Sequence, residues 1–212
     1  MYDEIIADLR AAYDRGAGER ERSEVAPWKV EERRRFLDAL RTAGARTLLE
    51  VGAGTGKDGH FFQEHGLDVT CTDLSPAMVA LCREKGLRAY VRDVLRLGFP
   101  PASFDAAYTL NCLLHVPKRD LPAALAAIRT VLRPGGLFYL GLYGGPDSEG
   151  VWPDDHHEPR RFFSFHTDDA IRHAVRPHFH LLDFRAIPIG STSGLHFQAL
   201  LLQRPVTPQA PP

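Results

Sequence analysis

The sequence predicts an α/β fold: a doubly wound, seven-stranded and mostly parallel sheet with an antiparallel C-terminal hairpin and helices on both faces. Strand-like apolar runs alternate with helical patterns between residues 47 and 143, which is typical of parallel strands joined by crossover helices. The last two strand-like runs, residues 180–187 and 196–202, have only eight residues between them. Because a parallel connection needs a dozen or more residues, these two strands are expected to pair antiparallel.

The first strand is expected at residues 47–51 and leads into a glycine-rich loop. Gly52, Gly54 and Gly56 occupy every second position, and glycines allow positive φ values and the close approach of a ligand to the backbone. A helix is expected at residues 57–65. The loop therefore lies at the carboxyl end of a strand, where open α/β sheets bind their ligands.

The second strand, residues 67–72, leads directly into an acidic residue. Asp73 lies 21 residues after Gly52, which is the spacing expected for a carboxylate that binds a ribose. Ser75 is a suitable helix N-cap, and Pro76 suits the first position of a helix. A simple role at the start of that helix is therefore the alternative for Asp73.

Polar residues also follow the third and fourth strands. The third strand, residues 88–91, precedes Asp93, and the fourth, residues 104–110, ends in Asn111. Both side chains are expected at the same edge of the sheet as Asp73. The remaining elements continue the alternation: a helix that Asp120 and Pro122 open and residues 133–136 close, a strand at residues 137–143, and a helix at residues 167–175.

Two helices are expected ahead of the first strand. The first carries an apolar stripe formed by Ile5, Ile6, Leu9, Ala12 and Tyr13. Residues 16–24 are charged and are predicted to form a loop, and Pro27 opens the second helix. The mixed charges at residues 31–35 predict a solvated face of that helix.

We expect three parts along the chain. Residues 1–46 form a helical cap over the ligand-binding edge, residues 47–204 form the sheet domain, and the proline-rich residues 205–212 form a disordered tail. With 212 residues and 44% hydrophobic content, the chain can bury one good core.

The glycine loop and the terminal hairpin together distinguish two kinds of nucleotide-binding fold. Counted from Gly52, the sixth position of a dinucleotide-type G-x-G-x-x-G motif is Lys57, and counted from Gly54 the motif starts two residues late. An acidic residue, Glu50, precedes the G-x-G-x-G loop instead. In this loop, in the acidic residues and in the hairpin, the chain resembles the class I (Rossmann-like) S-adenosylmethionine-dependent methyltransferases of the small-molecule type, over residues 48–204.

The resemblance implies S-adenosyl-L-methionine as the cofactor. The backbone of Gly52, Gly54 and Gly56 would approach its methionyl and ribose groups. The resemblance also implies Asp73 at the ribose, Asp93 and Val94 at the adenine, and Asn111 beside the methionyl amino group. Glu50, at the loop, and Leu74 are the remaining cofactor-binding residues that it implies. Two alternatives stay open, because Asp93 also suits a turn and Glu50 could instead hold the loop in place.

The catalytic residues are predicted from chemistry rather than from a motif. Methyl transfer from a sulfonium is an in-line displacement that depends mainly on alignment. An acceptor that must lose a proton needs a base near pH 7, and histidine suits this role. His115, beyond the fourth strand, is the first candidate, although a structural role is common at this position in related methyltransferases. His156 and His157, in a polar loop after the fifth strand, are the second.

Acceptor-binding residues are expected in the cap and in the segment after that loop. Tyr13 and Trp28 are the candidates in the cap, with ordinary packing as the alternative. Arg160 and Phe162 lie in a segment that combines cations with aromatic residues and could clamp an anionic or aromatic acceptor. A lid that packs on the sheet is the alternative for this segment.

Composition excludes several other classes. A formal charge of −1 gives no field for the capture of nucleic acid, and no apolar run reaches the length of a membrane span. Three cysteines without C-x-x-C spacing suggest a reducing, cytoplasmic setting. Residues 154–158 combine acidic residues with histidines, but neighbouring side chains of an extended segment point in opposite directions. They are therefore not expected to converge on one metal ion.

Three functions remain from the sequence. The first is methyl transfer to oxygen or nitrogen of a small-molecule acceptor by a monomer or homodimer. The second is an NAD(P)-dependent oxidoreductase, which the Gly54 register and Asp73 would allow. The third is a non-catalytic cofactor-binding protein of the same fold.

Overall fold

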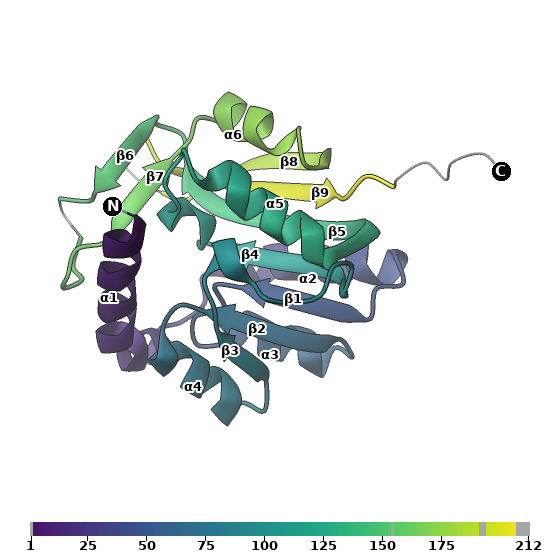
Figure 1. Ribbon diagram of the computed structural model, residues 1–212, viewed down its shortest axis with the longest axis horizontal. Coiled ribbons are helices and arrows are strands. Elements are labelled where there is room, and N and C mark those ends of the chain that lie inside the picture. The colour runs from purple at the N-terminus through teal and green to yellow at the C-terminus, as the bar shows by residue number, and fades with distance from the viewer. Residues whose placement is uncertain (1, 154, 191–193, 207–212) are drawn as a thin grey trace.

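A computed structural model describes residues 2–153, 155–190 and 194–206 (Figure 1). The strands are Thr47–Val51 (β1), Asp68–Asp73 (β2), Arg88–Val91 (β3), Phe104–Leu110 (β4), Leu132–Gly144 (β5), Ser148–Val151 (β6), Phe162–Phe165 (β7), His180–Pro188 (β8) and His196–Gln203 (β9). The helices are Tyr2–Arg22 (α1), Pro27–Thr42 (α2), Lys57–Glu64 (α3), Pro76–Glu84 (α4), Leu121–Val131 (α5) and Asp168–Val175 (α6), with short 3-10 turns at Val94–Arg96 (η1) and Leu113–His115 (η2).

Seven strands form one sheet in the order β3-β2-β1-β4-β5-β9-β8. The pairs among β1 to β5 are parallel, whereas β9 lies antiparallel between β5 and β8. The predicted doubly wound sheet with an antiparallel C-terminal hairpin is therefore confirmed. The strand order changes direction between β1 and β4, and a crevice for ligands forms at such a point.

Helices cover both faces of the sheet (Figure 1). Helices α5 and α6 bury their apolar residues against one face. Helices α2, α3 and α4 pack on the other, where an aromatic cluster of Phe36, Phe62, Tyr108 and Tyr139 fills the core. Each aromatic side chain in such a cluster buries roughly 150–250 Å², so this face is stabilised largely by rings.

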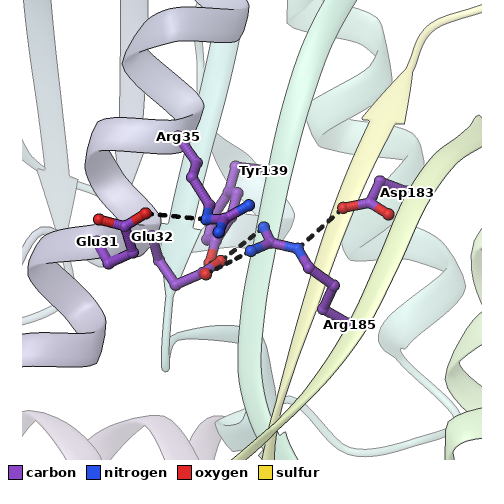
Figure 2. Close-up of polar contacts among 6 residues, drawn as sticks. All are labelled: Glu31, Glu32, Arg35, Tyr139, Asp183 and Arg185. Carbon is purple, nitrogen blue, oxygen red and sulfur yellow. Dashed lines mark hydrogen bonds and ion pairs between the residues drawn. The ribbon is translucent and has the colours of Figure 1, made fainter.

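Helix α2 is also attached to the sheet by a buried charge (Figure 2). Glu32 is 2% exposed. Its carboxylate accepts hydrogen bonds from Nη1 and Nη2 of Arg185 at 2.6 and 2.8 Å, and from the Tyr139 hydroxyl at 2.9 Å. The prediction that residues 31–35 form a solvated face is thus wrong at Glu32, because its charge is compensated by a strand far along the chain.

Helix α1 lies across the carboxyl ends of the strands rather than on a face of the sheet (Figure 1). It runs to Arg22, so the prediction of a loop at residues 16–24 is wrong. The Lys57 ammonium donates to the carbonyl oxygens of Arg20 and Ser23, and Glu21 pairs with Lys85. These contacts hold the last turns of α1, whose charged residues favour helix.

Two further elements differ from the expectation. Strand β5 begins at Leu132, five residues earlier than predicted, and the polar loop after it contains the β6–β7 hairpin. Most of the predicted tail, residues 207–212, lies outside the described residues, and the boundaries of the cap and the sheet domain remain predictions. In the part of the chain that the structure describes, no helix is long and apolar enough to cross a membrane.

Candidate functional site

A cleft lies between α1 and the carboxyl ends of β1, β2 and β4. It consists of neighbouring cavities that share lining residues. Most of the predicted cofactor residues line it: Glu50, Gly52, Gly54, Asp73, Leu74, Val94 and Asn111. Helix α1 supplies the opposite wall, through Tyr2, Leu9, Tyr13 and Arg20. The structure thus brings together residues from strands that are far apart in the chain.

The three loop glycines all have positive φ: +72° at Gly52, +54° at Gly54 and +79° at Gly56. A Cβ atom on Gly52 would lie 2.4 Å from the Cβ of Cys112, and one on Gly56 would lie 2.8 Å from Leu87. Gly54 instead faces the cleft, where the nearest atom to such a Cβ is the Arg20 Nε at 3.5 Å. Packing therefore requires the first and third glycines, and the second leaves room for a ligand.

Glu50 is buried behind this loop. Its Oε2 accepts a hydrogen bond from the Cys71 thiol at 3.4 Å, and a Cβ atom on Gly59 would lie 2.5 Å from the same oxygen. Burial raises the pKa of Glu50 well above its usual range, with the nearby Asp58 acting in the same direction. Glu50 both lines the cleft and supports the loop, so its two predicted roles stay open.

Asp73 is held by the backbone on both sides. Its carboxylate accepts hydrogen bonds from the amides of Gly54 and Ser75, at 2.8 and 2.9 Å. Burial raises the pKa of Asp73 to about 6, although these two amides oppose the shift. Because a carboxylate oxygen can accept more than one hydrogen bond, this geometry leaves capacity for hydroxyl groups in the cleft.

Asp93 is engaged with the cap. Its Oδ1 accepts hydrogen bonds from the Leu95 amide at 3.0 Å and from the Tyr2 hydroxyl at 2.8 Å. The first contact is the turn role that the sequence left open, and the second fastens α1 over the pocket that Val94 lines. A ligand in this pocket would therefore lie beneath the first turn of the helix.

Asn111, with a φ of +55°, has a buried side-chain oxygen, Oδ1, that lacks a hydrogen-bond donor among the described residues. A buried polar atom of this kind is rare and needs an explanation. An ammonium group in the cleft would satisfy it, which fits the predicted methionyl amino group.

His115 and Tyr13 meet across the cleft. The Nδ1 atom of His115 lies 2.7 Å from the carbonyl oxygen of Phe162, and Nε2 lies 2.6 Å from the Tyr13 hydroxyl. A carbonyl only accepts, so Nδ1 carries the hydrogen and Nε2 accepts from Tyr13. Burial lowers the pKa of His115 to about 3, and the imidazole is therefore neutral at physiological pH.

Arg161 completes this group. Its Nη1 donates to the Tyr13 hydroxyl at 3.1 Å, while Nε and Nη2 donate to the Asp155 carboxylate at 2.9 and 2.7 Å. Burial raises the pKa of Tyr13, and the charge of Arg161 opposes the increase. The Tyr13 oxygen thus lies between a cation and a neutral imidazole.

The other predicted acceptor and catalytic residues do not line this cleft, although some contact residues that do. His156 is exposed, and Nδ1 of His157 lies 3.4 Å from the Asp155 carboxylate, with its ring against that of Tyr13. Trp28 packs on Phe197 with ring centroids 4.4 Å apart. Arg160 is exposed, and Phe162 contributes its carbonyl group to His115. Their predicted roles remain predictions.

Residues 48–136 match the family described as Methyltransferase domain. This segment of the chain is a methyltransferase domain. The malonyl-[acyl-carrier protein] O-methyltransferase of Serratia marcescens is 31% identical over 131 residues, which are 61% of this chain and 50% of that protein. The ubiquinone biosynthesis O-methyltransferase of Xanthomonas euvesicatoria is 34% identical over 108 residues, which are 48% of this chain and 44% of that protein.

The chain spans about half the length of these curated relatives. Over nearly its whole length the chain shares its fold with the 1,6-didemethyltoxoflavin-N1-methyltransferase of Burkholderia thailandensis. That structure, solved with S-adenosylhomocysteine, has a TM-score of 0.72 and 24% identity, and the match covers 96% of this chain and 89% of that one. The resemblance inferred from the sequence is confirmed.

Sequence reasoning missed two cations of this site, Arg20 and Arg161. Arg20 lies in the segment predicted as a loop, yet it follows Tyr13 by seven residues, two helical turns on the same face. Arg161, not Arg160, reaches Tyr13, because consecutive residues of an extended chain point in opposite directions. Helical spacing from Tyr13 would have revealed Arg20. To choose between Arg160 and Arg161 requires knowing which way each side chain points, and the sequence does not give this.

Proposed function

We propose that the chain transfers a methyl group from S-adenosyl-L-methionine to an oxygen or nitrogen atom of a small-molecule acceptor. The match of residues 48–136 to methyltransferase domains carries this proposal, because the strand-end residues of the cleft all lie within it. Relatives and structural neighbours include both O- and N-methyltransferases by name. This supports a methyltransferase over an NAD(P)-dependent oxidoreductase.

The cofactor fits the polar groups of the cleft. Asp73 would accept hydrogen bonds from the ribose hydroxyls, and the Asn111 Oδ1 would accept one from the methionyl ammonium. Arg20 lines the cleft beside Gly54, and a guanidinium there suits the methionyl carboxylate. Asp93 and Val94 would bind the adenine, beneath the cap helix.

The protein's part in the reaction is alignment and the exclusion of water. The leaving group is a neutral thioether, so fixing acceptor, methyl carbon and sulfur in line can supply roughly 7–11 kcal/mol of the barrier. Helix α1 covers the cleft, and its Tyr13 hydroxyl lies in the same cavity as Asp73 and Asn111. We propose that Tyr13 receives the proton of a hydroxyl acceptor as the new methyl bond forms, while its own proton moves to His115 Nε2. At that moment the acceptor oxygen is strongly acidic, so a base of low pKa can take its proton.

Calorimetry with S-adenosylhomocysteine, NAD and NADP tests the cofactor. We expect S-adenosylhomocysteine alone to bind, and Asp73→Ala to weaken its binding by about 1.5–3 kcal/mol, the value of hydrogen bonds to a charged group. Asp68→Ala is the matched control, because Asp68 lies at the other end of β2 and pairs with Arg88 on the surface. Binding of NAD without S-adenosylhomocysteine would support the oxidoreductase, and cofactor binding without turnover of any acceptor would support a non-catalytic protein.

Ligand binding should also order the cap. Helix α1 is held over the cleft by polar contacts such as Tyr2 to Asp93 and Tyr13 to His115, and lids come from the less stable parts of a fold. Hydrogen exchange in residues 2–22 should slow when S-adenosylhomocysteine is added, while exchange in α5 stays unchanged. Equal protection of α1 with and without the ligand would contradict a lid.

A further inference from the structure

Two cations face the cleft without an acidic partner. The guanidinium of Arg20 and the ammonium of Lys29 both line the cavity beside the glycine loop. Within the described residues, neither has a carboxylate oxygen within 4.0 Å. Lys57 lines the same cavity, but its ammonium is engaged by two carbonyl oxygens of the cap.

The acidic groups of this cavity do not balance the two cations. Asp58 is paired with Arg33 at 3.1 Å, and its charge acts on Lys29 from beyond ion-pair distance. Glu50 is buried, and burial favours its neutral form by raising its pKa. Glu24 is exposed to water at the rim, where solvent screens its charge.

The proposed cofactor removes only one of these charges. S-adenosylmethionine brings one carboxylate, but it also brings an ammonium and a sulfonium, so it adds net positive charge. Arg20 lies beside Gly54, and its charge acts on Asp73. Arg20 is therefore positioned to bind the carboxylate of the cofactor. Lys29 is then a second cation, close enough to Arg20 for the two charges to repel each other.

The Lys29 ammonium lies against two aromatic rings. Its Nζ lies 5.3 Å from the centre of the Trp28 ring and 5.8 Å from that of Tyr143. Such contacts attract a cation but do not neutralise it, and burial, followed by the charge of Arg20, lowers the pKa of Lys29. Tyr143 lies at the end of β5, beside the end of β4 where the Asn111 amide donates to Gly141.

Resting on the function proposed above, we infer that the methyl acceptor is an anion that carries a carboxylate or a phenolate. Lys29 binds this anionic oxygen, and Arg20 binds the carboxylate of the cofactor. The atom that is methylated belongs to a separate group of the acceptor, which lies beside Tyr13 and carries the proton. Trp28 acts through Lys29, because its ring holds the ammonium at the mouth of the cavity. The acceptor thereby supplies the anionic partner that Lys29 lacks.

Ligand-observed NMR on the protein saturated with S-adenosylhomocysteine tests the inference, with benzoate and its neutral analogue benzamide as probes. We expect benzoate to bind at least roughly tenfold more tightly than benzamide, as one charge-assisted contact provides. Lys29→Met should abolish this preference while S-adenosylhomocysteine affinity and the melting temperature stay unchanged. Arg34→Met, which removes an exposed charge from the same helix, should retain the preference.

Three results would overturn the inference. Equal binding of benzoate and benzamide to the wild-type protein would show that the acceptor site does not select anions, and would leave the proposed function standing. Loss of S-adenosylhomocysteine affinity in Lys29→Met would assign Lys29 to the cofactor. Failure of the wild-type protein to bind S-adenosylhomocysteine would overturn both the inference and the proposed function.

Discussion

Replacing Arg185 with methionine should lower the free energy of unfolding by about 3–5 kcal/mol, because it leaves the Glu32 carboxylate buried without its cationic partner. Among the described residues, the Tyr139 hydroxyl would then be the one remaining hydrogen-bond donor to Glu32 (Figure 2). Urea unfolding followed by circular dichroism measures the change, provided that the slope with urea concentration stays the same.

Helix α2, which carries Glu32, also supplies a matched control. Arg35 and Glu31 form an ion pair at 3.2 Å whose side chains are both 56% exposed (Figure 2), so Arg35→Met should cost no more than about 1 kcal/mol. Converting both Glu32 and Arg185 to methionine should recover most of the loss, since no charge is then left buried. If Arg185→Met costs no more than Arg35→Met, the buried pair does not hold α2 to the sheet.

The sheet and the cofactor side of the cleft followed from local patterns in the sequence. Alternating strands and helices, the spacing of Asp73 from the glycine loop, and the short terminal connection each depend on neighbouring residues. Ser75 is an example, because its predicted N-cap bond to the Met78 amide is present at 3.1 Å. At the ends of β2 and β4, position along the chain was sufficient to place Asp73 and Asn111 in the cleft, whereas the Asp93 carboxylate is engaged by Tyr2 and Leu95.

The acceptor side did not follow, because its contacts join segments that are far apart. Tyr13 reaches His115 across 102 positions and Arg161 across 148, and no local pattern indicates which residues α1 will meet. Glu32 and Arg185 are 153 positions apart, so the run of charges around Glu32 predicted a solvated face. The sequence identified Tyr13 and His115 as separate candidates but could not indicate that they form one hydrogen-bonded pair.

This pair leads to the largest effect expected on catalysis. His115→Ala should lower the single-turnover rate by about 10²–10⁴-fold, the usual value of general-base assistance, because Tyr13 then has no imidazole to receive its proton. Tyr13→Phe should cause a similar loss. S-adenosylhomocysteine affinity should barely change, since the pair acts on the acceptor. The rates are measured with an acceptor found by screening for S-adenosylhomocysteine release.

Two controls separate this relay from the alternatives. In a relay, the double variant of Tyr13 and His115 should be little slower than either single variant, because the two residues act as a unit. His156→Ala and His157→Ala should stay near the wild-type rate. A loss of rate in one of these two variants alone would identify that histidine, in the loop after β5, as the base. If all the alanine variants remain within a few-fold of wild type, alignment alone carries the reaction.

The pH dependence gives an independent check on the same pair. The relay needs a neutral His115, and burial holds the pKa of this residue at about 3, below the value near 6.5 of a free imidazole. The neutral form is therefore lost only as the pH falls toward 3. Titration of His115 should thus not lower the rate of the chemical step between pH 7 and pH 5, and any decrease in that range should persist in His115→Ala. A decrease with a midpoint near 6.5 that His115→Ala removes would mean that the imidazole is solvated in the working enzyme, and that Tyr13 does not shield it.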